Sequence, residues 1–181
     1  MRVRILAVLC CLWLPLAATC GETAPWGHAK LLEKTYSKQK VVYDVSVKTV
    51  EQLGNVLDRA SYLSILNEAD PFESKIVIVL HGDEIGFFAI RDYGKYRDLM
   101  ARAQSLTVGG IVDIRMCRAA AKRRGFEAQD IHGFVTMVPM ADAEIAELQK
   151  QGFAYMQYGV SGPAAVFAQS PPSVSAAPTA R

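Results

Sequence analysis

The chain has 181 residues, of which 51% are hydrophobic and 21% are charged. That composition excludes an intrinsically disordered chain and fits one globular domain with a sizeable core. The formal net charge is +2, and the chain beyond residue 20 is neutral because Arg2 and Arg4 precede it. A neutral domain gives no support for nucleic-acid binding, so we predict no nucleic-acid partner.

The N-terminus has the pattern of a secretory signal peptide. Arg2 and Arg4 form a positive start, an apolar run covers residues 5–16, and small residues follow it. The run is shorter than the roughly 20 residues that a membrane-spanning helix needs. We therefore predict a signal peptide over residues 1–20 and an exported protein, with a buried N-terminal helix as the alternative. Lipidation of Cys20, which would attach the protein to a membrane, is the alternative to cleavage before Gly21.

Three further segments follow in chain order. Residues 21–39 are polar and irregular, and we predict a flexible lead-in. Residues 40–158 carry the hydrophobic patterning of a folded domain. The tail over residues 159–181 is rich in Pro, Ser and Ala, and it cannot bury enough apolar surface to fold, so we predict disorder.

Within the domain, short apolar runs alternate with segments of helical periodicity. In chain order we predict a strand over 40–47, a helix over 49–67, a strand over 75–82, a helix over 93–104, a strand over 109–116, a helix over 118–124, a strand over 132–140, a helix over 142–151 and a strand over 153–157. This alternation predicts an α/β fold, a flavodoxin-like three-layer sandwich with a mostly parallel five-stranded sheet.

Local signals mark several ends of these helices. Thr49 and Gln52 have the spacing of a capping box at the start of the first helix. The Asp70-Pro71 dipeptide follows its end. Gly125 and Gly152 follow the last two helices at the position where a left-handed residue ends a helix.

The carboxyl ends of parallel strands meet at one edge of a sheet, and active regions lie at that edge. Asp44, His81 and Cys117 are expected to gather there. Cys117 is the single cysteine beyond residue 20, and it precedes a helix with Arg118 as its neighbour. A helix start and nearby cations favour a thiolate. A reactive thiol and an inert buried thiol are both consistent with a lone cysteine.

Other candidate residues have weaker signals. His81 can orient or deprotonate a thiol or a substrate, or it can be a structural residue at the sheet edge. We interpret Asp83 and Glu84 as solvent-exposed loop residues and His132 as a structural residue at a strand start. The histidines and cysteine lack metal-ligand spacing, so we predict no metal site and no cofactor.

Cys117 and Arg123 also have the C-x5-R spacing of phosphatase loops. Such loops need glycines so that backbone N–H groups can surround an oxyanion. The intervening segment is rich in alanine and favours a helix, which would direct Arg123 away from the thiol. We therefore disfavour phosphatase chemistry.

The segment CRAAAKRRG over 117–125 resembles the C-x-A-A-x-x-R-R-G segment around the sulfur-accepting cysteine of DsrE and TusD proteins. The apolar strand that ends in HGD at 81–83 is similar to the wider DsrE/DsrF-like superfamily. So is VPMADAEIAELQKQGFAYMQ over 138–157. The resemblance covers nearly the whole domain.

This resemblance implies a flavodoxin-like fold and transfer of sulfane sulfur as a persulfide on Cys117. Arg118 would hold the sulfur anion and His81 would assist proton transfer. It also implies a homo-oligomer, a trimer or a hexamer, that exchanges sulfur with donor and acceptor proteins or inorganic sulfur species. An exported member would act in the periplasm. The alternative is a non-catalytic scaffold subunit of the same fold with an inert Cys117.

Overall fold

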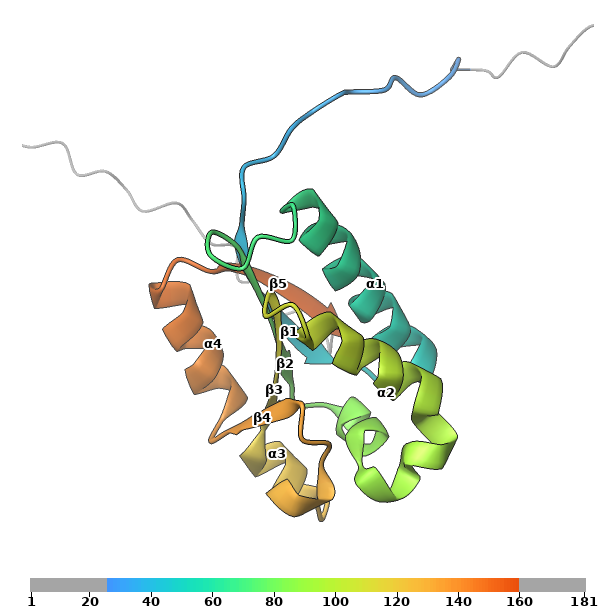
Figure 1. Ribbon diagram of the computed structural model, residues 1–181, viewed down its shortest axis with the longest axis vertical. Helices are drawn as coiled ribbons and strands as arrows, with labels where there is room; N and C mark the ends of the chain where they lie inside the picture. The colour runs from blue at the N-terminus through green and yellow to red at the C-terminus, as the bar shows by residue number, and fades with distance from the viewer. Residues whose placement is uncertain (1–25, 160–181) are drawn as a thin grey trace, which may run out of the picture. The chain divides into compact units, whose positions relative to one another are not determined.

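The computed structural model describes residues 26–159, and Figure 1 shows how their helices and strands are arranged. The predicted signal peptide, the lipidation site at Cys20 and residues 160–181 of the predicted tail lie outside the described residues. The chain divides into two units, Met1–Thr35 and Tyr36–Arg181. In the first unit, residues 26–35 contain neither helix nor strand. No helix within residues 26–159 combines the length and the apolar character needed to cross a membrane.

The second unit alternates strands and helices. Its described residues form β1 (Lys40–Ser46), α1 (Val50–Leu66), β2 (Lys75–Leu80), α2 (Tyr93–Thr107), β3 (Val112–Cys117), α3 (Arg118–Arg123), β4 (Val135–Val138), α4 (Ala141–Lys150) and β5 (Ala154–Gly159). Three 3-10 segments join them, η1 (Asp83–Phe88), η2 (Ile90–Asp92) and η3 (Ala128–Asp130).

The five strands form one sheet in the order β4-β3-β2-β1-β5, and every pair is parallel. The connections from β1 through β2 and β3 to β4 each lead to the next strand in one direction along the sheet. The connection from β4 to β5 leads back across the sheet to the other side of β1. Right-handed crossovers therefore place α4 on the opposite face from α1 and α2. Figure 1 shows this arrangement, with α1 beside α2 and α4 against the strands across the sheet. The predicted three-layer α/β fold is confirmed.

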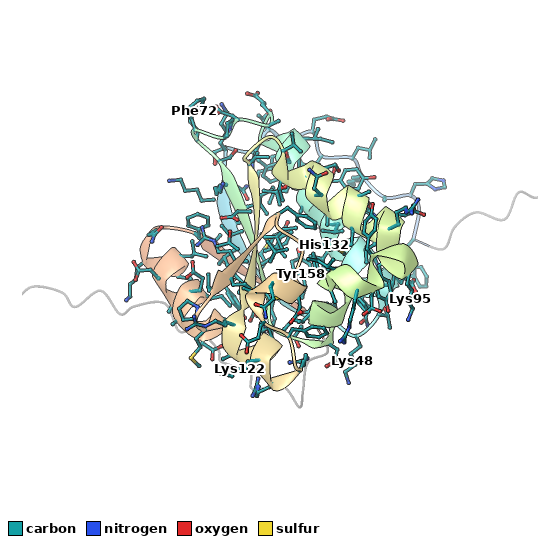
Figure 2. The ribbon with its side chains drawn as sticks, turned by 60° about the horizontal axis from the view of Figure 1, so that its bottom comes forward. Lys48, Phe72, Lys95, Lys122, His132 and Tyr158 are labelled. Atoms are coloured by element: carbon teal, nitrogen blue, oxygen red, sulfur yellow. The ribbon has the colours of Figure 1, made fainter. Side chains whose placement is uncertain are left out.

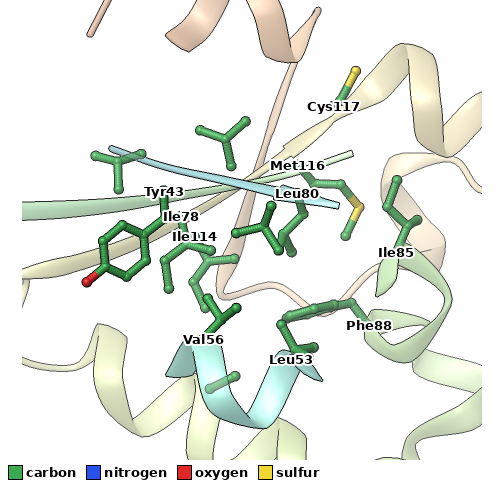
Figure 3. Packing of buried hydrophobic residues seen from close by; sticks show 14 of the residues in the cluster. Tyr43, Leu53, Val56, Ile78, Leu80, Ile85, Phe88, Ile114, Met116 and Cys117 are labelled. Carbon is green, nitrogen blue, oxygen red and sulfur yellow. The ribbon is translucent and has the colours of Figure 1, made fainter. Parts of the chain in front are cut away.

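The core lies on both faces of β2. Its residues Ile76–Leu80 are all fully buried, as a continuous apolar run predicts for a central parallel strand. Figure 3 shows Leu53 and Val56 of α1 packed toward Ile78 and Leu80. Full burial of a Leu or Ile side chain contributes roughly 1.5 to 3 kcal/mol, so these contacts fix α1 against the sheet.

The predicted helix ends are present in the structure. The N–H of Gln52 donates to Thr49 Oγ1 at 3.1 Å, and the N–H of Thr49 donates to Gln52 Oε1 at 3.2 Å. Both members of the capping box are therefore satisfied. Gly125 and Gly152 have φ values of +79° and +87°, the left-handed conformation that glycine adopts without a steric penalty.

The fourth strand is shorter than predicted. We expected a strand over 132–140, but β4 covers only Val135–Val138. The N–H of Val135 donates to the carbonyl of His132 at 3.0 Å, which forms a turn instead of an extended strand start. Pro139 has no N–H to continue the sheet hydrogen bonding, and Met140 already precedes α4. The prediction that His132 starts a strand is wrong for these reasons.

Different segments of the chain lie at the two ends of the strands. Phe72, in the turn before β2, lies at the end from which the strands start, and Lys122 of α3 lies at the opposite end (Figure 2). The carboxyl ends of the strands therefore converge near α3. This is the edge where the sequence predicts the functional residues.

Candidate functional site

A cavity of about 460 Å³ lies at the carboxyl ends of β2, β3 and β4. Its wall consists of His81, Cys117, Ala119, Ala120, Lys122, Arg123, Met140, Ala141 and Asp142. His81 directly follows β2, Cys117 ends β3, and Met140 follows β4. Because β2, β3 and β4 pair in parallel, the segments that follow them must lie next to one another.

Cys117 is the last residue of β3 and the N-cap of α3, so the predicted placement before a helix is confirmed. The N–H of Ala120 donates to Cys117 Sγ at 3.4 Å. The residue is only 5% exposed and forms no disulfide. Figure 3 shows it at the margin of the hydrophobic core, with its sulfur directed away from Leu80 and Phe88. Cys117 is therefore almost fully buried and also lines the cavity.

The imidazole of His81 contacts the carboxylate of Asp44, a residue of β1. The distance from His81 Nε2 to Asp44 Oδ1 is 2.5 Å, and the side chain of His81 is 29% exposed. The Tyr155 hydroxyl of β5 donates to the second oxygen, Asp44 Oδ2, at 2.5 Å. The predicted gathering of Asp44, His81 and Cys117 at one edge is therefore present, and Tyr155 joins it.

The charges of this group follow from its hydrogen bonds. Burial opposes ionisation of Asp44, but the hydrogen bonds from His81 and Tyr155 outweigh it and lower the pKa of Asp44. An ionised carboxylate accepts and cannot donate, so Nε2 of His81 carries the proton. The hydrogen bond to Asp44 raises the pKa of His81 more than burial lowers it. Burial, then the Asp44 hydrogen bond, raises the pKa of Tyr155 to about 12, so Tyr155 remains a donor.

Glu84 binds two backbone N–H groups in the loops next to the site. We expected a solvated loop residue, but its side chain is fully buried, so that prediction is wrong. Its Oε1 accepts from the N–H of Gly82 at 2.7 Å, and its Oε2 accepts from the N–H of Val47 at 2.8 Å. Burial raises the pKa of Glu84, and these backbone donors partly oppose the rise. One carboxylate therefore ties the loop after β1 to the loop after β2.

The basic residues of α3 have different surroundings. Lys122 and Arg123 belong to the wall of the cavity, although we expected a helix to direct Arg123 away from the thiol. Arg118 is exposed and is not part of that wall. Arg124 donates to Asp83 Oδ1 at 3.0 Å and is already paired. The cationic residues that line the cavity are therefore one turn further along α3 than predicted, and both are exposed.

Within residues 26–159, no group of three His, Cys, Asp or Glu side chains is placed to hold a metal ion. His132 lies apart from the cavity, between the rings of Tyr93 and Phe134. Burial lowers the pKa of His132, and its Nε2 has no hydrogen-bond partner in this part of the chain. These contacts fit the structural role that we predicted for it.

Sequence reasoning missed Glu84 and Tyr155 as parts of this site. Tyr155 lies 111 residues from Asp44 in sequence, and no local pattern connects them. Glu84 gave a weak signal, because apolar residues, Ile85, Phe87 and Phe88, follow it in the sequence. A charged residue that opens a buried segment is expected to find hydrogen-bond partners.

Comparison with known proteins supports the fold and identifies the family. A Methanobacterium thermoautotrophicum protein of unknown function has a similar structure, with a TM-score of 0.53 and 18% sequence identity over 66% of this chain and 99% of that chain. This likeness shows a shared fold. A search of curated protein sequences finds no match. The sequence profile of the DsrE/DsrF-like family matches residues 42–158, which include β2, β3, β4, most of β1 and β5, His81 and Cys117. The chain belongs to the DsrE/DsrF-like family.

Proposed function

We propose that the protein is a sulfur carrier or sulfurtransferase that accepts a sulfane sulfur on Cys117 as a persulfide. The observation that carries this proposal is the position of Cys117 on the wall of a cavity, at the carboxyl edge of the sheet. The family to which the chain belongs is associated with sulfur relay. A thiolate or persulfide at this position has a backbone N–H donor, from Ala120, and cationic side chains close by.

The side chains of the cavity have distinct roles in this proposal. Cys117 is the nucleophile that receives the sulfur. His81 exchanges a proton with the thiol or with the leaving group. Arg118 neighbours Cys117 in sequence, but it lies outside the cavity wall, unlike Lys122 and Arg123. We therefore assign the stabilisation of the sulfur anion to Lys122 and Arg123.

The second candidate function is a scaffold subunit with an inert thiol. The low exposure of Cys117, 5%, favours it, because structural buried cysteines are unreactive. Reaction with a donor separates the two functions, since an inert thiol takes up no sulfur from any source.

We also propose that the protein acts in the periplasm as a homo-oligomer, a trimer or a hexamer. The signal-peptide pattern of residues 1–20 supports export. Tyr62, Ile65 and Leu66 near the end of α1 are exposed apolar side chains and offer a surface for a second copy. Light scattering of the purified chain tests the assembly, and a monomer at all concentrations would contradict it.

Sulfur loading tests the function directly. The full chain is incubated with polysulfide or a persulfidated donor protein, and peptide mass mapping locates any added sulfur. We expect one additional sulfur atom on the peptide that contains Cys117 and none on that peptide in Cys117→Ser. Peptide mapping is needed because Cys10, Cys11 and Cys20 are also thiols. No adduct at Cys117 with any donor would refute the carrier function and leave the scaffold subunit.

A further inference from the structure

The cavity beside Cys117 has an excess of positive groups on its wall. Lys122 and Arg123 both line it, and within residues 26–159 neither forms an ion pair. Arg124, the next residue, is neutralised by Asp83. The wall contains one carboxylate, that of Asp142 in the first turn of α4. Two exposed cationic residues without an ion-pair partner among residues 26–159 therefore belong to the cavity wall that also contains the thiol.

His81 also lines the cavity, and the acidic groups around it favour its protonated form. Asp44 of β1 contacts Nε2 directly, at 2.5 Å, and is itself fixed by the Tyr155 hydroxyl of β5. Glu84 of η1 and Asp142 of α4 also act on the imidazole electrostatically. The cationic neighbours on the wall, from α3, oppose protonation, but the contact with Asp44 is the closest.

Asp44 is therefore a positioning residue. It lies behind His81 and not on the cavity wall, so it acts on a bound molecule only through the imidazole. It keeps the proton on Nε2, and it offsets the cost of a positive charge on a half-buried ring. Tyr155 occupies the second oxygen of Asp44 and prevents rotation of the carboxylate away from His81.

We propose that Asp44 and Tyr155 hold His81 as an imidazolium on the cavity wall, and that the cavity thereby selects an anionic, oxyanion-bearing sulfane donor of the thiosulfate class. This inference rests on the proposed function for the sulfur-transfer step. The selection of an anion does not depend on that step. A small dianion fits a cavity of about 460 Å³ and matches the net positive charge of its wall.

The transfer step with such a donor is balanced without another reactant. The Cys117 thiolate attacks the outer sulfur of thiosulfate and forms an S–S bond to Sγ. The S–S bond of thiosulfate breaks, and its electron pair leaves with the sulfite dianion. The protein then holds a persulfide anion, and the total charge is unchanged. The cations lower the repulsion between the thiolate and the dianion, which is the main electrostatic barrier to this attack.

A pair of alkylating reagents tests the charge of the cavity without any sulfur transfer. Iodoacetate and iodoacetamide react with the same thiolate, but only iodoacetate is an anion. Both rates are proportional to the fraction of Cys117 that is ionised, so the ratio of the iodoacetate rate to the iodoacetamide rate does not depend on that fraction. The same ratio measured for glutathione gives the reference value, and a difference between the two ratios reports the charge near Cys117. We expect a ratio above that of glutathione, by about fivefold for each unit of positive charge close to the thiol. Peptide mapping restricts the measurement to Cys117.

Matched variants then assign the effect. Lys122→Gln combined with Arg123→Gln should reduce the ratio towards that of glutathione. The same change at Lys95 and Arg97 of α2, outside the cavity wall, should leave it unchanged. An equal ratio for the wild type and glutathione, or an equal loss in both double variants, would overturn the anion cavity.

The pH profile of the same ratio tests Asp44. In the wild type, the ratio should fall as pH rises through the raised pKa of His81, because the ring loses its charge. Asp44→Asn should move this fall to lower pH, and Tyr155→Phe should move it in the same direction by less. His81→Gln should remove the step. A purely structural role for Asp44 would leave the midpoint in place, and that result would overturn the proposal.

Thiosulfate itself completes the test and separates the two proposals. We expect thiosulfate to load Cys117 in the wild type and to load Asp44→Asn at least several-fold more slowly at neutral pH, while polysulfide loads both. If polysulfide loads Cys117 but thiosulfate neither loads it nor competes with iodoacetate, the selection of this donor class is wrong and the carrier function stands. If no donor loads Cys117 while thiosulfate still competes with iodoacetate, the carrier function is wrong and the anion cavity stands.

Discussion

At the edge where the strands start, charged side chains form a partly exposed cluster of ion pairs, whereas at the opposite edge the carboxyl groups are more deeply buried. Lys38 contacts Asp70 and Glu73 at 2.7 and 3.0 Å on the surface. At the carboxyl edge, Glu84 is fully buried and Asp44 is shared between His81 and Tyr155. The first arrangement closes a turn. In the second arrangement, buried carboxyl groups position backbone N–H groups and the His81 imidazole beside the cavity.

This difference has a physical origin in the parallel sheet. All five strands end on the same side, so the loops that follow them must share a small space. Their backbone N–H groups cannot all reach water, and Glu84 accepts two of them. At the opposite edge, the neutral side chain of Asn67 performs the comparable task by pairing with the backbone of Gln39.

The largest contrast between the two edges is expected for Glu84→Ala. The change leaves the N–H groups of Val47 and Gly82 buried without an acceptor, at about 1 to 3 kcal/mol for each. Urea unfolding should therefore show a loss of about 2 to 6 kcal/mol. Glu73→Ala at the other edge removes only an exposed ion-pair partner and should change stability much less. Similar losses for the two variants would break the comparison.

A smaller loss is expected for Gly82→Ala. A Cβ at Gly82 would lie 2.5 Å from Glu84 Oε2 and 2.7 Å from Ser46 Cα, so the backbone must shift. Overpacking of this kind costs about 1 to 3 kcal/mol. Gly86→Ala is the matched control four residues later, because a Cβ there meets nothing within 4 Å. Thermal unfolding of both variants measures the difference, and a stable Gly82→Ala protein would show that these loops are loosely packed.

The smallest effect is the pH dependence of the Asp44–His81 pair. The folded-state pKa of His81 is raised above 6.5, so its contribution to stability is present below that pH and is lost as pH rises through the raised value. The folded-state pKa of Asp44 is lowered below 3.8, so its contribution is present above that pH and is lost as pH falls through the lowered value. The stability difference between the wild type and Asp44→Asn should therefore be largest between about pH 4 and 6.5.

Denaturant unfolding across that pH range checks this prediction. His132→Gln is a useful comparison, because burial lowers the pKa of His132 and its protonation therefore destabilises the folded protein. A wild-type contribution from Asp44 that is equal at pH 5 and pH 9 would mean that the pair is not ionic.

The fold could be predicted from local patterns because its main determinants are local. The apolar run over 75–82 indicates a central strand, and the spacing of Thr49 and Gln52 indicates a helix start. Each signal lies within a few residues and depends on no distant partner. The error at the fourth strand arose because Gly133 and Phe134 form a turn closed by the hydrogen bond from Val135 to His132, which an apolar run does not reveal.

The candidate site could be predicted only in part. Cys117 and His81 were found because strand ends in a parallel sheet converge by topology. Their supporting residues depend on tertiary contacts: Glu84 reaches 37 residues to Val47, and Tyr155 reaches 111 residues to Asp44. The alanine-rich sequence correctly indicated the helix, but it did not reveal that Arg123 belongs to the cavity wall.

The two hydrogen bonds that Glu84 accepts limit insertions and deletions in the loop after β2. The carboxylate contacts a residue two positions before it and another across the sheet edge, so one inserted residue between Gly82 and Glu84 would separate it from both donors. The turn between α2 and β3 has no such constraint, since Val108 is 74% exposed and a Cβ at Gly109 meets open space. A peptide tag inserted after Val108 should therefore be tolerated, whereas the loop after β2 has a fixed length.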